Sequence, residues 1–203
     1  VKKSPHQAPP VPVDAIGQLE RLVSSAHTLA LRVFAGVACL CVHGVKRWSD
    51  VQHVVSMTAT EDGLIVTTYK SKKKASALKW AALRDGFGLP DWVSPFVAAL
   101  SEAGLPRKDY LVLRPTVDLI GFTEYPATWA DANRALHALL VLAGMGAEEA
   151  VGYSMHSLRH VYPTCAFQLL FPPAAVTIMG HWAGKDDRMP LVYDGHKTAT
   201  ELA

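Results

Sequence analysis

A histidine and an arginine three residues apart, His156 and Arg159, lie inside an otherwise apolar stretch that runs from Met155 to Leu170. On a helix, side chains at this spacing share a face, so the sequence predicts that an imidazole and a guanidinium point the same way. A fixed cation beside a titratable ring suits the binding of a phosphate group. Because a single His-x-x-Arg pair is common in proteins, the surrounding residues decide whether it does chemistry.

The stretch that carries this pair has apolar residues at alternating steps of three and four, which predicts a helix with one face in the core. Those residues are Met155, Leu158, Tyr162, Cys165 and Leu169. Pro163 lacks a backbone donor and would crowd the Arg159 carbonyl in a continuous helix, at a cost of about 3 kcal/mol. We therefore expect a kink or break between Arg159 and Tyr162. His160 is expected on another face, as a structural hydrogen-bonding residue.

The composition favours one well-buried domain, since half of the 203 residues are apolar. Lysine and arginine number 20 against 18 aspartates and glutamates, so any nucleic-acid surface must be local. Residues 1–13 are proline-rich and predict an extended linker, followed by a single domain over residues 14–203. The apolar stretches are too short to span a membrane. Cys39, Cys41 and Cys165 lack metal-type spacing, which favours free thiols in an intracellular protein.

Most of the chain shows helical periodicity, and one segment shows strand propensity. Helices are predicted from an N-cap at Asp14, over 27–43 as the central apolar helix, over 90–103, and from a capping box of Thr128 and Asp131. The β-branched residues of 64–69 predict a strand, with 75–83 as its antiparallel partner. The tip of this hairpin is basic, with Lys70, Lys72, Lys73 and Lys74.

Several motifs along the chain, taken in order, resemble the active-site motifs of tyrosine recombinases (integrases). They are Gly44-Val45-Lys46-Arg47-Trp48-Ser49-Asp50, Lys70, His156-Ser157-Leu158-Arg159-His160, Gly180-His181 and Tyr193. The resemblance covers about residues 14–203. Arg47-Trp48-Ser49-Asp50 and Met189-Pro190-Leu191-Val192-Tyr193-Asp194 are similar to the eukaryotic DIRS-type and Crypton-type mobile-element enzymes. The resemblance to tyrosine recombinases implies an α+β fold, mainly α-helical, with a small antiparallel β-sheet.

The resemblance also implies a role for each motif residue in cleaving a phosphodiester. Arg47 and Arg159 would clamp the phosphate with their planar forks. Tyr193 would attack phosphorus and form a 3′-phosphotyrosine link, and Lys70 would protonate the leaving 5′ oxygen. His156 and His181 would hydrogen-bond the phosphate or assist proton movement. This strand cleavage and rejoining needs no metal, nucleotide or other cofactor.

The implied partner is double-stranded DNA, and the implied role is integration or excision of a mobile element. Candidate contacts to the DNA backbone are Lys72, Lys73, Lys74 and Arg188. The resemblance further implies a homo-tetramer on two DNA sites, a monomer when free, no membrane association, and a nuclear location in a eukaryotic host.

Some assignments stay open at this stage. Lys72 competes with Lys70 as the general acid. Arg32 is a rival to Arg47 as the first arginine, and another alignment of the Arg-Trp-Ser-Asp motif would place Cys39 there and give a defective site. A zinc site from His156, His160, His181 and His196 matches no zinc spacing. Two other functions remain: an inert DNA-binding module on the same scaffold and, with a poorer fit to this short chain, a type IB topoisomerase.

Overall fold

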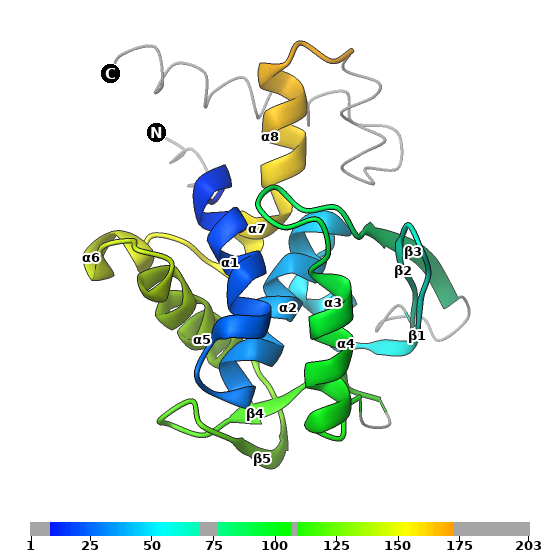
Figure 1. Cartoon of the computed structure of the whole chain (residues 1–203), viewed down its shortest axis with the longest axis vertical. Helices are drawn as coiled ribbons and strands as arrows, with labels where there is room; N and C mark the ends of the chain where they lie inside the picture. Colours follow the sequence, from blue (N-terminus) through cyan, green and yellow to red (C-terminus); the bar gives the residue numbers. More distant parts are fainter. Residues whose placement is uncertain (1–8, 70–76, 107–108, 173–203) are drawn as a thin grey trace, which may run out of the picture.

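One apolar helix, α2 (Leu29–His43), forms the centre of the computed structural model, which describes residues 9–69, 77–106 and 109–172 (Figure 1). It packs against α1 (Val13–Ser25), α4 (Val93–Glu102), α5 (Trp129–Leu142) and α7 (Met155–Arg159). Because its neighbours surround it, α2 is buried on nearly every face, as its apolar sequence predicts. No helix in the described ranges is long and apolar enough to cross a membrane.

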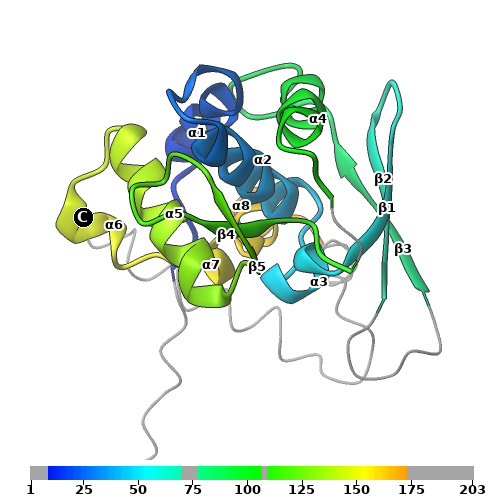
Figure 2. The ribbon, with the colours of Figure 1, turned by 90° about the horizontal axis from the view of Figure 1, so that it is seen from below.

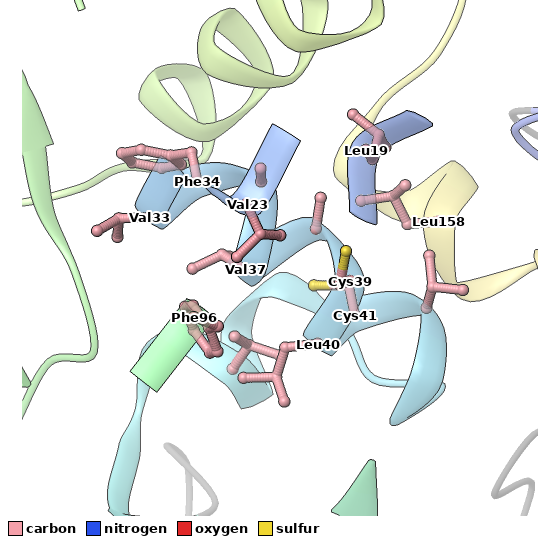
Figure 3. Close-up of a cluster of buried hydrophobic side chains, with 14 of the residues drawn as sticks. Leu19, Val23, Val33, Phe34, Val37, Cys39, Leu40, Cys41, Phe96 and Leu158 are labelled. Atoms are coloured by element: carbon pink, nitrogen blue, oxygen red, sulfur yellow. The ribbon is translucent and has the colours of Figure 1, made fainter. Parts of the chain in front are cut away.

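The core around α2 is made of aliphatic and aromatic side chains, with two thiols among them (Figure 3). Cys39 and Cys41 are fully buried and free, and Cys165 is free and half-buried. Burial raises the pKa of the Cys39 and Cys41 thiols, so both stay protonated and behave as small apolar groups.

A three-stranded antiparallel sheet lies at one edge of the helical body (Figure 2). Its strands are β1 (Val54–Ala59), β2 (Gly63–Tyr69) and β3 (Ala77–Leu83), in the order β1-β2-β3. The predicted antiparallel pairing of 64–69 with 75–83 is confirmed over the described residues 64–69 and 77–83, and Val66 pairs with Trp80 in its register. A second, two-stranded sheet is formed by β4 (Leu113–Pro115) and β5 (Phe122–Pro126).

The helix ends agree with the sequence in some places and differ in others. The capping box of Thr128 and Asp131 opens α5 as predicted, because the Thr128 hydroxyl accepts from the Asp131 amide at 3.2 Å. The predicted N-cap at Asp14 is wrong: the N-cap of α1 is Pro12, and Asp14 lies in the first turn. A negative charge in the first turn still stabilises α1, because the N-terminal end of a helix carries a partial positive charge. A four-residue helix, α6 (Ala147–Ala150), follows α5.

The predicted break after Arg159 is confirmed. Arg159 ends α7, His160 links the helices, and α8 (Val161–Gln168) follows (Figure 1). Pro163 thus lies in the first turn of a new helix, where its missing N–H has no helical acceptor to lose. The break also interrupts the predicted apolar stripe: Met155 is buried, but Leu169 is 72% exposed. The core-facing assignment of Leu169 was therefore wrong.

Candidate phosphodiester site

The turn that delivers Arg47 to the surface begins where α2 ends. The Lys46 amide donates to the Cys41 carbonyl at 3.1 Å and the Val45 amide donates to the Val42 carbonyl at 3.0 Å. This is a Schellman motif, whose left-handed residue is Val45 at φ 50°. A β-branched residue in that conformation stores strain of about 1–2 kcal/mol.

Glycine stands one residue earlier, at Gly44, because the Trp80 ring packs directly against it. A Cβ at Gly44 would lie only 2.4 Å from the ring of Trp80. The Trp80 indole N–H donates to the Thr68 hydroxyl at 2.9 Å, which fixes the ring on the β2–β3 hairpin. The end of α2 is therefore joined to the sheet at the turn that precedes Arg47.

Arg47 itself is exposed and forms the N-cap of α3 (Trp48–Gln52). Its backbone amide donates to Asp50 Oδ2 at 3.3 Å. Asp50 therefore acts as a cap of α3 through the backbone of Arg47.

The second part of the site, α7, is held in place at its N-terminus. The Ser154 hydroxyl accepts from the His156 amide at 3.3 Å, and the Ser157 hydroxyl accepts from the Ser154 amide at 3.1 Å. The Met155 amide donates to Asn133 on α5 at 2.9 Å. These bonds orient a helix of only five residues, which would be unstable by itself.

Arg47 and Arg159 both lie close enough to His156 for their charges to act on it, although Arg47 is distant from the other two residues in the sequence. The pKa of His156 is lowered below its ordinary value of 6.5, mainly by partial burial and further by the positive charges of Arg159 and Arg47. Arg159 is only 7% exposed, whereas His156 lies at the surface. At neutral pH the site therefore presents two guanidinium groups and a neutral imidazole.

His160 lies beside this group rather than on a separate face. Its ring centroid is 4.6 Å from that of His156, in an edge-on arrangement, and the residue is 5% exposed. The expectation that His160 points elsewhere was wrong, because residues four apart remain neighbours even where α7 gives way to α8.

Lys46 is a cation that the sequence analysis missed. It is 3% exposed, and its Nζ lies 5.4 Å from the centroid of the Trp80 ring. Burial lowers its pKa, the carboxylate of Asp50 raises it and the charge of Arg159 lowers it further, to about 8. The sequence signal was its place beside Arg47 after a helix-ending glycine, but nothing there distinguishes a buried lysine from an exposed one.

The two alternatives to Arg47 at the first arginine position, Arg32 and Cys39, lie in different environments. Arg32 forms an ion pair with Glu102 at 2.9 Å. Cys39 lies in the core, with no exposed surface. Arg47, by contrast, acts on His156 electrostatically.

The remaining candidate residues lie outside the described residues. They are Lys70, His181 and Tyr193 of the catalytic set, and Lys72, Lys73, Lys74 and Arg188 of the DNA-binding set. Their roles stay predictions. Over residues 9–69, 77–106 and 109–172, no group of three or more histidine, cysteine or acidic side chains is placed to hold a metal ion.

A buried polar chain joins α8 to the body of the protein. Glu20 has no exposed surface and accepts from His43 Nε2 at 2.9 Å and from the amides of Phe87, Gly88 and Leu89. The other ring nitrogen of His43 bonds the Tyr162 hydroxyl at 2.9 Å. Because α8 follows α7 directly, these hydrogen bonds also help to hold α7, the helix that carries Arg159.

Solved structures of tyrosine recombinases match this fold. The XerH site-specific recombinase bound to its difH substrate gives a TM-score of 0.63 at 13% identity, covering 100% of this chain and 55% of that one. The XerA recombinase gives 0.60 at 15% identity, over 95% and 61% of the two chains. The Tn1549 transposon integrase in complex with circular intermediate DNA gives a TM-score of 0.55 at 15% identity, covering 100% of this chain and 70% of the integrase chain.

No protein-family model matches the sequence, and no curated protein matches it. The chain spans 55% and 61% of the XerH and XerA chains. At these identities the similarity is one of fold. The chain has the α+β fold of tyrosine recombinase catalytic domains, mostly helical with a small antiparallel sheet.

Proposed function

We propose that this chain is the catalytic part of a site-specific DNA recombinase that cleaves and rejoins strands through a 3′-phosphotyrosine intermediate. The observation that carries the proposal is that the charges of Arg47 and Arg159 both act on His156, on a fold shared with such enzymes. Two arginines beside a neutral imidazole suit a phosphodiester, because planar guanidinium groups bind its non-bridging oxygens in pairs.

In the proposed reaction, the phenol oxygen of Tyr193 forms a bond to phosphorus and the bond from phosphorus to the 5′ oxygen breaks. Lys70 gives a proton to that oxygen, and the proton of the phenol passes to a base at the site. Arg47 and Arg159 stabilise the charge that develops on the phosphoryl oxygens. The tyrosine–phosphate bond conserves energy, so a 5′-hydroxyl of another strand reseals the DNA by the reverse step.

The role of neutral His156 follows from its lowered pKa. A neutral imidazole can accept the phenol proton or donate a hydrogen bond to phosphate, depending on its tautomer. Charging the ring beside two arginines is unfavourable until an anion binds. His156 therefore acts with the arginines rather than as an additional permanent charge.

The biological role follows from the sequence motifs and remains part of this proposal. Arg47-Trp48-Ser49-Asp50 and the Met-Pro-x-x-Tyr-Asp segment that ends at Tyr193 favour a mobile-element enzyme of the DIRS or Crypton type. The proposed partner is double-stranded DNA, with a homo-tetramer formed on two sites. The proposed location is the nucleus in a eukaryotic host.

The test is a covalent-adduct assay with a nicked suicide DNA substrate, in which the short strand leaves after cleavage. The wild-type protein should form an adduct that survives denaturation, and Tyr193→Phe should form none. An identical adduct with the Phe variant would show that Tyr193 is not the nucleophile. DNA binding without any adduct from the wild type would favour the inert DNA-binding module.

A further inference from the structure

One interior hydrogen bond connects the two chain segments that carry the arginines of the candidate site. His43 is the last residue of α2 and stands four residues before Arg47. Tyr162 lies in the first turn of α8 and stands three residues after Arg159. The Tyr162 hydroxyl and His43 Nδ1 are 2.9 Å apart. The bond therefore joins α2 to α8 close to each arginine along the chain.

The backbone between His43 and Arg47 is closed by hydrogen bonds to α2. The amides of Gly44, Val45 and Lys46 donate to carbonyls in the last turns of α2 at 3.0 to 3.1 Å. This turn therefore follows the end of α2 as one unit. A displacement of the His43 end of α2 would move Arg47 with it.

The helix that carries Arg159 is held at both ends. A hydrogen bond to Asn133 on α5 holds the N-terminal end of α7. Beyond Arg159, the His160 carbonyl accepts from the Thr164 amide at 3.0 Å, so α8 begins without an intervening loop. Tyr162 in this first turn thus supplies the hydrogen bond to α2 at the end of α7 where Arg159 lies.

The His43 ring is fixed from its other side as well. Its Nε2 donates to Glu20 at 2.9 Å, and it stacks on the Trp92 ring with centroids 5.2 Å apart. The Glu20 carboxylate also accepts from the amides of residues 87–89, and neither of the two side chains has exposed surface. Because hydrogen bonds weaken steeply when their geometry changes, this paired network holds the ring more narrowly than apolar contacts would.

We propose that His43 and Tyr162 are positioning residues of the phosphodiester site, whose hydrogen bond fixes Arg159 relative to Arg47 so that both arginines contact one phosphate. This inference rests on the proposed function, since it adds residues that act on the same site. Both residues act through the arginines and touch no substrate themselves. Without the bond, the ends of α2 and α7 separate, and the two charges act less on His156 and on a bound phosphate.

The test compares Tyr162→Phe, His43→Phe and the double variant with two controls. Tyr125→Phe removes a hydroxyl from a side chain that is 67% exposed, and Leu100→Val trims a buried core residue in the last turn of α4. The first measurement is an NMR titration of the His156 ring without DNA, which needs no activity. The second is the rate of adduct formation at saturating nicked DNA, together with the affinity for that DNA.

In folded Tyr162→Phe, the pKa of His156 should rise toward its value in Arg47→Ala without reaching it, because the charge of Arg47 remains but acts less strongly. The rate of adduct formation should fall by roughly three- to thirtyfold, because misplaced groups stabilise the reacting phosphate less well. The affinity for DNA should change by less than about twofold, because no charge is lost.

The double variant separates a shared interaction from two independent effects. His43→Phe and the double variant should both match Tyr162→Phe in the two measurements, because all three lack the same bond. Changes that add up in the double variant would contradict a role for the bond itself. Tyr125→Phe and Leu100→Val should keep the wild-type titration and the wild-type rate.

A wild-type His156 titration and a wild-type rate in folded Tyr162→Phe would overturn the inference and leave the bond with a stabilising role alone. Equal changes in Leu100→Val would overturn it too, because lower stability would then explain them. If Tyr162→Phe does not fold, His43→Phe decides by the same criteria. These failures leave the wild-type adduct intact, whereas failure of the proposed function abolishes the adduct of the wild type itself.

Discussion

The Tyr162 hydroxyl on α8 and His43 Nδ1 on α2 lie 2.9 Å apart, joined by a hydrogen bond in the interior of the protein. The Glu20 carboxylate accepts a hydrogen bond from the opposite ring nitrogen, Nε2, so His43 bridges Tyr162 and Glu20. Burial raises the pKa of Tyr162 to about 12, so its hydroxyl keeps its proton across the physiological range. The bond thus ties the helix after Arg159 to the central helix.

Replacing Tyr162 with Phe should destabilise the protein by about 1–2 kcal/mol, because a buried ring nitrogen of His43 loses its partner. Urea unfolding measures this loss as a lower midpoint concentration of urea, with an unchanged dependence of the unfolding free energy on urea concentration. Tyr125→Phe is the matched control, since Tyr125 is 67% exposed. A Tyr162→Phe protein as stable as the wild type would show that the bond contributes nothing.

Glu20→Gln should destabilise the protein by roughly 3 kcal/mol at pH 7, because the charged acceptor of His43 and three amides is lost. Burial alone would raise the pKa of Glu20, but the hydrogen bonds from His43, Gly88 and Phe87 outweigh burial and lower it below the ordinary 4.5. The wild type therefore loses this stabilisation as pH falls from about 4.5 through the lower folded-state pKa.

Urea unfolding of both proteins between pH 7 and pH 3 measures this contribution. The difference in unfolding free energy between wild type and Glu20→Gln should shrink as the pH falls. Glu102→Gln, which removes the partner of Arg32, should show no comparable loss. A constant difference between wild type and Glu20→Gln across this range would contradict the assignment of a lowered pKa to Glu20.

Arg47→Ala should raise the pKa of His156, because one of the two charges that oppose its protonation is removed. Arg159→Ala should raise it too. An NMR titration of the His156 ring measures the shift directly, with Arg32→Ala as the control because that arginine pairs with Glu102. An unchanged His156 titration in Arg47→Ala would mean that the two residues do not share a site.

Lys46 should make the unfolding free energy rise with pH between 8 and 10.5. The folded pKa of about 8 lies below the ordinary 10.5, so the unfolded chain binds more protons in this window. The full contribution is at most about 3 kcal/mol. Lys46→Met should be more stable than the wild type below pH 8, and this difference should disappear toward pH 10.5. The same pH slope in both proteins would contradict the lowered pKa.

Lys70→Ala should slow adduct formation by roughly 10²–10⁴-fold through loss of the general acid. A 5′-phosphorothiolate substrate, whose sulfur leaves without a proton, should restore the rate. Lys72→Ala, the matched control, should be close to wild type on both substrates. Rescue of Lys72→Ala instead would move the role to Lys72, and rescue of neither would mean that neither Lys70 nor Lys72 protonates the leaving group.

Much of the fold was predictable because local rules and packing agree. The apolar sequence of 29–43 requires burial on all sides, and the Thr128 capping box and the 64–69 strand follow from local chemistry. The break after Arg159 was predictable because Pro163 cannot continue a helix at that place. Leu169 was assigned wrongly because α8 ends at Gln168, so Leu169 lies past the helix whose face packs on the core.

The candidate site was predictable as a set of residues but not as an arrangement. Sequence spacing placed His156 beside Arg159, whereas the meeting with Arg47 depends on how α7 is anchored to α5 through Asn133. The burial of Lys46 depends on Trp80, which arrives from a strand far along the chain. Long-range contacts of this kind leave no local pattern.

The measurement that tests the central claim most directly is the rate of covalent adduct formation in Arg47→Ala and Arg159→Ala, compared with Arg32→Ala. If the two arginines stabilise the cleaved phosphodiester, each variant should react roughly 10²–10³-fold more slowly than the wild type while remaining folded. Arg32→Ala should react at the wild-type rate. Wild-type rates from folded Arg47→Ala and Arg159→Ala would contradict the assignment of this site.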